Sequence, residues 1–439
     1  MSKKILLPII ALMSISACSS NNAVTSSISP NQSLSNDPVF VDHRITQPNK
    51  TFNSAHQALN EEYVSSLKAF GVDFYKAVND DKNSVFSPLS IATCYSMLYD
   101  GALDETKAEL KAMLHYSDNF NHLEEIQKML LNIAIDDVEK GTYLDLAQSL
   151  WIHDKFIDRI SQEYFKKMQD YYFAESYHGV LETEEMHQML ADYINAKTND
   201  FLHVDKDTFK EYAGILWLLN TIYLKAKWVT AFPEENNRNK KFTNIDGTSN
   251  NSVEYMNNSI YSSYYKAENY MISSLPYYHG LTMTILLPNE DVDYAKVLND
   301  ESAINAMVEY YNTRNHMPAT INYSIPKFKV QTSYELEKVL PKLGVELCFD
   351  DDRANLFGLV EPGGASKGNL YVERSKHEAG IEVNNGGTEA AAYTIIEVDE
   401  KAVAYPDPSD VQFICNRPFS YIINTSDGLP LFMGTVNKL

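Results

Sequence analysis

The pattern of apolar and polar positions predicts a mixture of helices and strands from about residue 63 onward. Over residues 63–74, apolar side chains fall on one face at helical spacing, which predicts a first helix. Ser87 and Pro88 predict the start of a second helix, because a serine hydroxyl caps free backbone amides and a proline needs no hydrogen-bond donor in the first turn. Thr183 is expected to cap a further helix that extends to about Ala196.

Strands are predicted between these helices. Residues 143–153 alternate sufficiently to form a strand, and the apolar run Leu216–Trp228 is typical of a strand buried on both faces. Asn220 lies inside that run and needs hydrogen-bond partners if it is buried. Residues 261–288 predict strands joined by tight turns, and residues 334–343 are expected to be mostly helical.

Residues 381–400 form a potential strand pair with a hinge. Ile381–Val383 alternates, Asn384–Gly387 supplies residues that accept unusual backbone angles, and Thr388–Glu400 contains neither glycine nor proline. As a strand, Thr388–Glu400 would present two faces. The first carries Thr388, Ala390, Ala392, Thr394, Ile396, Val398 and Glu400, and the second carries Glu389, Ala391, Tyr393, Ile395, Glu397 and Asp399. Pro406 and Pro408 then exclude a central strand.

This segment resembles the reactive loop of the serpins, the protease inhibitors that insert a cleaved loop into their own sheet. The resemblance rests on the hinge motif Gly387–Ala392 and on two C-terminal motifs, Asn416–Phe419 and Leu431–Gly434. Phe86–Ala92 and Asn220–Trp228 match the family in the same order, so that the resemblance covers roughly Tyr63–Leu439. An ordinary alanine-rich surface loop is the alternative for the hinge motif taken alone.

The resemblance implies an α+β serpin fold, with helices packed around three β-sheets and an exposed reactive loop. Ser87, Ser90, Asn220 and His377 match the family's central polar cluster, whose implied role is a hydrogen-bond network that closes the main sheet. Trp228 would stand where the loop first inserts. The structural alternatives are a satisfied core histidine at position 377 and a simple core anchor at position 228.

The implied function is the trapping of a serine protease as an acyl-enzyme. A protease cleaves the loop, and the segment from Thr388 onward inserts into the sheet with the protease attached. The loop hinge comprises Asn385, Gly386, Gly387, Thr388, Glu389, Ala390, Ala391 and Ala392. Thr388 and the alanines are small and uncharged, which favours insertion. Asn385 stands where the family usually has glutamate, and we expect Asn385 and Gly386 to loosen the hinge.

The reactive bond is expected between Lys401 and Ala402, because Lys401 lies fourteen residues after Gly387. A lysine there implies a trypsin-like target. Cleavage after Val403, Ala404 or Tyr405 would imply an elastase-like or chymotrypsin-like target instead, and a cysteine protease is a further alternative. A second class of function also stays open, namely a non-inhibitory serpin that acts as a surface binding protein.

Composition and charge narrow the function further. The chain has 439 residues, of which 44% are hydrophobic and 22% charged, as expected for a globular protein. Its formal net charge of −22 and the lack of a basic patch argue against nucleic acid as a partner. We find no catalytic motif, metal-ligand spacing or phosphate-binding loop, so we expect no enzyme activity, metal or cofactor. We expect a monomer.

The N-terminus carries a targeting signal. Residues 1–17 combine two lysines with a short apolar run, and the small residues before Cys18 resemble a bacterial lipobox in which that cysteine is lipidated. An ordinary secretory peptide is the alternative. Residues 18–55 are rich in Ser, Asn, Pro and Gln and predict a flexible tether, with the serpin domain at 56–439. Ser19 suggests an outer-membrane lipoprotein that is periplasmic or surface-exposed.

Overall fold

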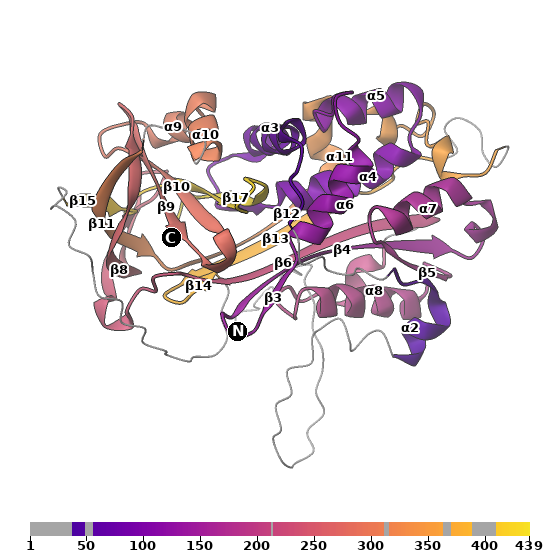
Figure 1. Ribbon diagram of the computed structural model, residues 1–439, viewed down its shortest axis with the longest axis horizontal. Helices are drawn as coiled ribbons and strands as arrows, with labels where there is room; N and C mark the ends of the chain where they lie inside the picture. Colours follow the sequence, from indigo (N-terminus) through magenta and orange to yellow (C-terminus); the bar gives the residue numbers. More distant parts are fainter. Residues whose placement is uncertain (1–36, 49–55, 212–213, 311–315, 363–369, 389–409) are drawn as a thin grey trace, which may run out of the picture.

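The computed structural model describes residues 37–48, 56–211, 214–310, 316–362, 370–388 and 410–439. Helices and strands alternate through these segments (Figure 1). The α-helices are α2 (Pro38–His43), α3 (Glu61–Val78), α4 (Pro88–Gly101), α5 (Asp104–Met113), α6 (His122–Asn132), α7 (Gln162–Asp170), α8 (Glu184–Lys197), α9 (Tyr294–Leu298), α10 (Glu301–Val308) and α11 (Leu336–Val339).

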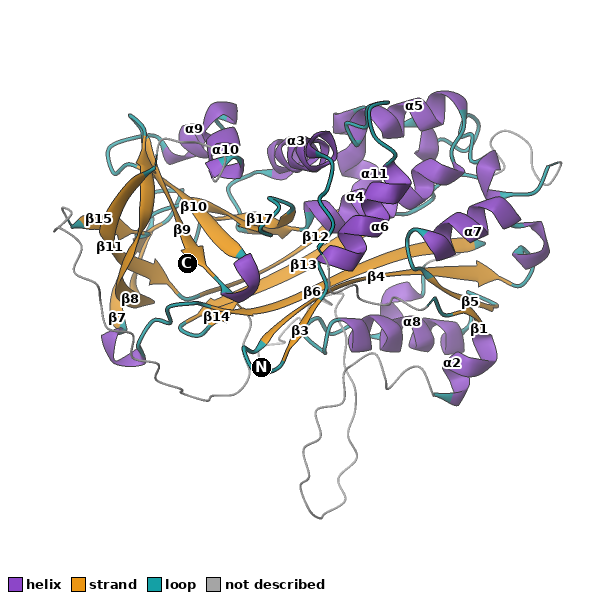
Figure 2. Cartoon of the chain, in the orientation of Figure 1, coloured by secondary structure: helices purple, strands orange, loops and turns teal. Residues whose placement is uncertain are grey.

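The strands pair into two large sheets (Figure 2). The main sheet contains β1 (Arg44–Thr46), β3 (Ile135–Asp137), β4 (Thr142–His153), β5 (Glu175–Gly179), β6 (Leu216–Lys227), β12 (Phe328–Glu335), β13 (Lys376–Asn384) and β14 (Gly387–Thr388). The second sheet contains β2 (Ser84–Phe86), β7 (Arg238–Thr243), β8 (Ser249–Lys266), β9 (Tyr270–Pro276), β10 (Thr282–Pro288), β11 (Met317–Pro326), β15 (Val411–Ile414), β16 (Phe419–Asn424) and β17 (Pro430–Val436).

The main sheet has the order β1-β5-β4-β6-β14-β13-β12, with β3 paired to β4. Strands β4 and β6 form a long antiparallel pair, from Tyr143 opposite Lys225 to Ile152 opposite Leu216. Helix α4 packs against β6, and Figure 1 shows α4 and α6 on one side of this sheet with α8 on the other. The main sheet is therefore the central layer of an α+β fold.

The second sheet is joined through one long strand, β8. The 18-residue β8 pairs with β7 and β11 along most of its length and with β9 at its end. The strands that the structure describes therefore form two hydrogen-bonded sheets, whereas the resemblance implies three. The mixture of helices and sheets agrees with the predicted fold class.

Local signals in the sequence place several elements as expected. The Ser87 hydroxyl accepts a hydrogen bond from the Ser90 N–H at 3.1 Å and caps α4, and the Thr183 hydroxyl caps α8 in the same way. Strand β6 forms where the apolar run predicted it. Its first half, Leu216–Asn220, is only half-buried, because the neighbouring strand is not paired with it there.

Residues 37–48, which lie within the predicted flexible tether, form α2 and β1 and pack against the domain. Phe40 of α2 is 2% exposed, and its ring lies 5.6 Å from that of Tyr177. Strand β1 pairs with β5 and covers the outer edge of the main sheet. Within the described part of the chain, no helix combines the length and apolarity that a membrane span requires. Cys18 and the expected signal peptide lie outside the described residues.

Candidate functional site

The predicted hinge lies between two strands of the main sheet. In β14, Gly387 is opposite Lys227 of β6 and Asn384 of β13, and Thr388 is opposite Ala226 and Val383. The described residues show no direct pairing between β6 and β13 beyond this short strand. The start of the loop therefore already occupies one end of the gap between two sheet strands.

A cavity of about 460 Å³ occupies the region between β6, β13 and the helices on either side. Side chains of α4 and α8 line it together with those of the two strands, and Asn220, His377 and Thr388 are among its lining residues. The facing edges of β6 and β13 carry backbone groups that a further strand would pair with. The geometry is suited to the addition of one strand below β14.

Glycine is required at position 387 by a close approach of two backbones. Gly387 has a φ of +151°, and a Cβ atom on it would lie 2.0 Å from the carbonyl oxygen of Ala226. Any larger residue would push β14 away from β6. The close packing of β14 against β6 therefore explains the glycine at position 387 of the hinge motif.

Two aromatic residues hold the hinge from the side. Trp228 stacks on Tyr277, with ring centroids 4.1 Å apart and planes 11° from parallel. The Trp228 indole N–H donates to the carbonyl oxygen of Asn384 at 3.0 Å, and the Tyr277 hydroxyl lies 2.5 Å from Oγ1 of Thr388. Burial raises the pKa of Tyr277, so the phenol stays protonated. Trp228 therefore lies beside the hinge residues, with its side chain bonded to Asn384 and its backbone N–H to the Gly386 carbonyl.

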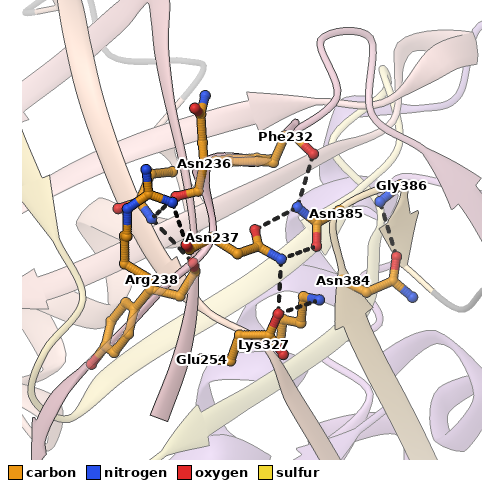
Figure 3. A network of polar contacts seen from close by, with 11 residues as sticks. Phe232, Asn236, Asn237, Arg238, Glu254, Lys327, Asn384, Asn385 and Gly386 are labelled. Atoms are coloured by element: carbon orange, nitrogen blue, oxygen red, sulfur yellow. Dashed lines mark hydrogen bonds and ion pairs between the residues drawn. The ribbon is translucent and has the colours of Figure 1, made fainter. Parts of the chain in front are cut away.

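Asn385 is anchored rather than loose, which corrects our expectation. Its side chain is 8% exposed, and its Nδ2 donates to the Phe232 carbonyl at 2.8 Å and to Oδ1 of Asn237 at 2.9 Å (Figure 3). The Asn385 carbonyl accepts from the Phe232 N–H at 3.1 Å. The glycines that follow Asn385 suggested a mobile segment. The Asn385 side-chain amide instead bonds Phe232 and Asn237.

The predicted polar cluster assembles at the middle of the main sheet. The Ser87 N–H donates to Nε2 of His377 at 3.0 Å, and the Ser90 hydroxyl donates to Oδ1 of Asn220 at 2.5 Å. These bonds join the start of α4 to β13 on one side of the gap and to β6 on the other. The Asn220 Nδ2 has no hydrogen-bond partner in the described part of the structure.

This cluster is not arranged for nucleophilic catalysis. Burial lowers the pKa of His377 to about 3, so that its imidazole is neutral. Its Nε2 accepts from a backbone amide, while the two serine hydroxyls bond elsewhere, to the Ser90 N–H and to Asn220. Activation of a serine needs a hydroxyl–imidazole bond. Within the described residues, no group of three or more His, Cys, Asp or Glu side chains could hold a metal ion.

Some predicted site residues lie outside the described residues. They are Cys18, Glu389, Ala390, Ala391, Ala392, Lys401 and Ala402. Other residues at the site were missed by the sequence analysis. Tyr277 was one of many tyrosines in its segment, and Asn237 follows a run of polar residues without any distinguishing signal.

Comparison with protein families gives one match over most of the chain. A family model described as "Serpin (serine protease inhibitor)" matches residues 65–439. Neuroserpin from Homo sapiens is 27% identical over 397 residues, which cover 86% of this chain and 91% of neuroserpin.

Comparison with solved structures identifies the same fold. The thermophilic serpin tengpin in its native state aligns with a TM-score of 0.73 and 23% identity, covering 90% of this chain and 98% of tengpin. Thyroxine-binding globulin in complex with thyroxine aligns with a TM-score of 0.68 and 20% identity, covering 86% of this chain and 98% of that protein. At these identities the likeness establishes the fold.

Proposed function

Because the chain belongs to the serpin family, we propose that it inhibits serine proteases by trapping them as acyl-enzymes. One observation carries the proposal: β14 is already paired between β6 and β13, above an unfilled gap. A loop cleaved beyond Thr388 extends the strand that β14 begins. No new register has to be found, because Thr388 is already opposite Ala226 and Val383.

The energy for trapping comes from strand addition. Filling the gap with about a dozen ladder hydrogen bonds at ~1 kcal/mol each contributes roughly 10 kcal/mol, comparable with the stability of a whole domain. About fourteen inserted residues carry an attached protease ~45 Å along the sheet. The serine nucleophile belongs to the protease. This chain supplies the cleavable loop, the space between β6 and β13, and the free energy that strand addition releases.

The target class follows from the loop sequence. We place the reactive bond between Lys401 and Ala402, so that the lysine enters the acidic specificity pocket of a trypsin-like protease. Glu397, Asp399 and Glu400 precede this bond and suit a protease with basic outer subsites. Cleavage after Val403 or a neighbouring residue would change the target class and leave the mechanism unaltered.

Localisation is a separate part of the proposal. Residues 1–18 support a lipoprotein signal, with Cys18 lipidated and the domain held at the outer membrane as a monomer. Mass spectrometry of the mature N-terminus tests this proposal. A diacylglyceryl-modified Cys18 supports it, and an unmodified N-terminus from an ordinary signal peptide contradicts it.

The inhibitory proposal is tested by mixing the purified chain, without its lipid anchor, with trypsin. We expect a band near the summed mass on a denaturing gel and a released peptide that starts at Ala402. Active-site-blocked trypsin is the control, since it cannot form the acyl bond. Complete cleavage without any complex, with a panel of trypsin-like, elastase-like, chymotrypsin-like and cysteine proteases, would contradict the proposal.

A non-inhibitory serpin is the second candidate. The fold similarity to thyroxine-binding globulin, solved with thyroxine bound, supports it, since that protein is named for binding a small molecule. The melting temperatures of the intact and the cleaved chain separate the two candidates, because only an inserting chain gains a strand on cleavage.

A further inference from the structure

The side chains of Asn237 and Asn385 form a reciprocal amide pair. The Asn385 Nδ2 donates to Asn237 Oδ1 at 2.9 Å, and the Asn237 Nδ2 donates to Asn385 Oδ1 at 3.2 Å (Figure 3). Asn385 lies between β13 and β14, at the base of the reactive loop, whereas Asn237 directly precedes β7 of the second sheet. The pair therefore connects the loop hinge to a different sheet.

A charged pair fixes the orientation of Asn237. The Asn237 Nδ2 also donates to Oε1 of Glu254 at 2.8 Å, and Glu254 is paired with Lys327 at 2.9 Å. The lysine bond lowers the pKa of Glu254, so that the carboxylate is ionised. A carboxylate only accepts hydrogen bonds, so the NH₂ group of Asn237 has to face it. The Asn237 oxygen is then presented to Asn385.

The backbone of the hinge is held at the same place. The carbonyl oxygens of Asn384, Asn385 and Gly386 accept from the Trp228 indole, the Phe232 N–H and the Trp228 N–H, respectively. Gly387 and Thr388 continue directly into the paired strand β14. Residues up to Thr388 are therefore already fixed between β6 and β13 while the chain is intact.

We propose that Asn237 and Asn385 are positioning residues that hold the base of the reactive loop in its inserted geometry before cleavage. The inference rests on the proposed inhibitory function. The acyl-enzyme either inserts its loop, which traps the protease, or is hydrolysed, which releases it. A hinge that is already paired in the sheet speeds insertion relative to hydrolysis. Loss of either amide lets the hinge leave the gap, so that insertion slows relative to hydrolysis.

The same geometry makes a distinctive prediction about the family's usual glutamate. A carboxylate at position 385 cannot donate to the Phe232 carbonyl or to Asn237 Oδ1. This carboxylate would accept from the same Asn237 NH₂ group as Glu254, which places two negative charges close together. Lys327 is already paired with Glu254. We therefore expect Asn385→Glu, although it restores the common family residue, to impair trapping in this chain.

The test measures the ratio of cleaved free inhibitor to covalent complex, using a protease that the wild-type chain traps. For Asn237→Ala, Asn385→Ala and Asn385→Glu, we expect this ratio to rise about 3- to 10-fold, as the loss of one or two net hydrogen bonds implies. The matched control is Asn239→Ala on β7, an exposed asparagine whose side-chain amide, among the described residues, bonds only Ser252, at 3.4 Å. This control should leave the ratio unchanged.

A double-variant cycle checks that the pair acts as a unit. Asn237→Ala combined with Asn385→Ala should raise the ratio by less than the product of the two single effects, because the amide pair is lost in all three variants. Thermal melting establishes that each variant is folded before its ratio is measured. If Asn237→Ala fails to fold, Asn385→Glu and Asn385→Ala give the answer alone.

Two failures are distinguishable. If the wild-type chain traps no protease, the proposed function and this inference are both overturned. If the wild type traps its target and the folded variants keep the wild-type ratio, or Asn385→Glu lowers it, only the positioning role is overturned. A merely structural pair would lower the melting temperature without moving the ratio.

Discussion

The backbone N–H of Ser87 donates a hydrogen bond of 3.0 Å to Nε2 of His377, and this bond ties the start of α4 to β13. Nε2 accepts this bond only while it carries no proton. Burial lowers the pKa of His377 from 6.5 to about 3, since the charged imidazolium would lose its hydration there. The closed arrangement of the cluster thus depends on a neutral histidine.

We expect the intact protein to lose stability as the pH falls from about 6.5 towards 3. In this window, His377 binds a proton in the unfolded chain and not in the folded one, so the free energy of unfolding decreases with decreasing pH. One such group contributes a slope of ~1.4 kcal/mol per pH unit. Chemical denaturation of the wild type and of His377→Gln at several pH values measures it. Carboxylates titrate in both proteins, so the difference between the two slopes isolates the histidine, and equal slopes would contradict the assignment.

Thr388→Arg is expected to convert the chain from inhibitor to substrate. Thr388 is 4% exposed, and its hydroxyl lies 2.5 Å from that of Tyr277. A guanidinium at this place would be buried without a partner, which costs several kcal/mol and blocks the first step of insertion. A denaturing gel after incubation with a trapped protease should show cleaved chain and at least about tenfold less complex. Thr388→Ser keeps the hydroxyl and should trap like the wild type; unchanged trapping by the arginine variant would refute the insertion mechanism.

Gly387→Ala should disrupt the hinge while Gly386→Ala should not. A Cβ at position 387 meets the Ala226 carbonyl oxygen at 2.0 Å, whereas one at position 386 has only Asn384 Oδ1 nearby, at 3.6 Å. The first clash must be relieved by moving β14, at a cost of roughly 2 kcal/mol or more. Hydrogen exchange of the β14 and β6 amides measures this, and we expect faster exchange at Thr388 and Ala226 only in Gly387→Ala. Equal exchange in the two variants would show that the close approach is not maintained in solution.

Cleavage within the loop should raise the melting temperature if the chain inserts. About 10 kcal/mol from the added strand corresponds to a rise of roughly 10–20 °C for a chain of this size. Differential scanning calorimetry before and after limited proteolysis measures the change, with the protease removed. An unchanged melting temperature would favour the non-inhibitory candidate, because a chain whose cleaved loop does not insert adds no strand and gains no stability.

Local signals sufficed for much of the fold and for part of the site. Three features can be recognised from the residues next to them in the sequence. They are the cap at Ser87, the apolar run of β6 and the close-packed Gly387. The family motifs then bring Ser90, Asn220 and His377 to one place. Such features are predictable because a short stretch of sequence determines them.

Features that depend on distant partners were not predictable. Asn237 and Asn385 are 148 positions apart, and neither has a neighbour that signals an amide pair. The second sheet is joined through β8, whose partner strands come from several regions of the chain. Residues 37–48 lie in a stretch whose composition predicts disorder, and they are ordered by contacts with α8 and β5.

The docking of residues 37–48 can be tested with two adjacent side chains. Phe40 is 2% exposed and packs on Tyr177, whereas Val39 in the same helix is 42% exposed. Removing a buried phenylalanine side chain typically costs 3–5 kcal/mol, while truncating an exposed valine costs ~0.5 kcal/mol or less. If α2 and β1 unfold together with the domain, Phe40→Ala lowers the free energy of unfolding by about that amount and Val39→Ala leaves it nearly unchanged, as measured by urea denaturation. If the segment detaches first, Phe40→Ala instead leaves global stability unaltered and speeds proteolysis near Arg44. A variant with wild-type stability and wild-type proteolysis would contradict the docked arrangement.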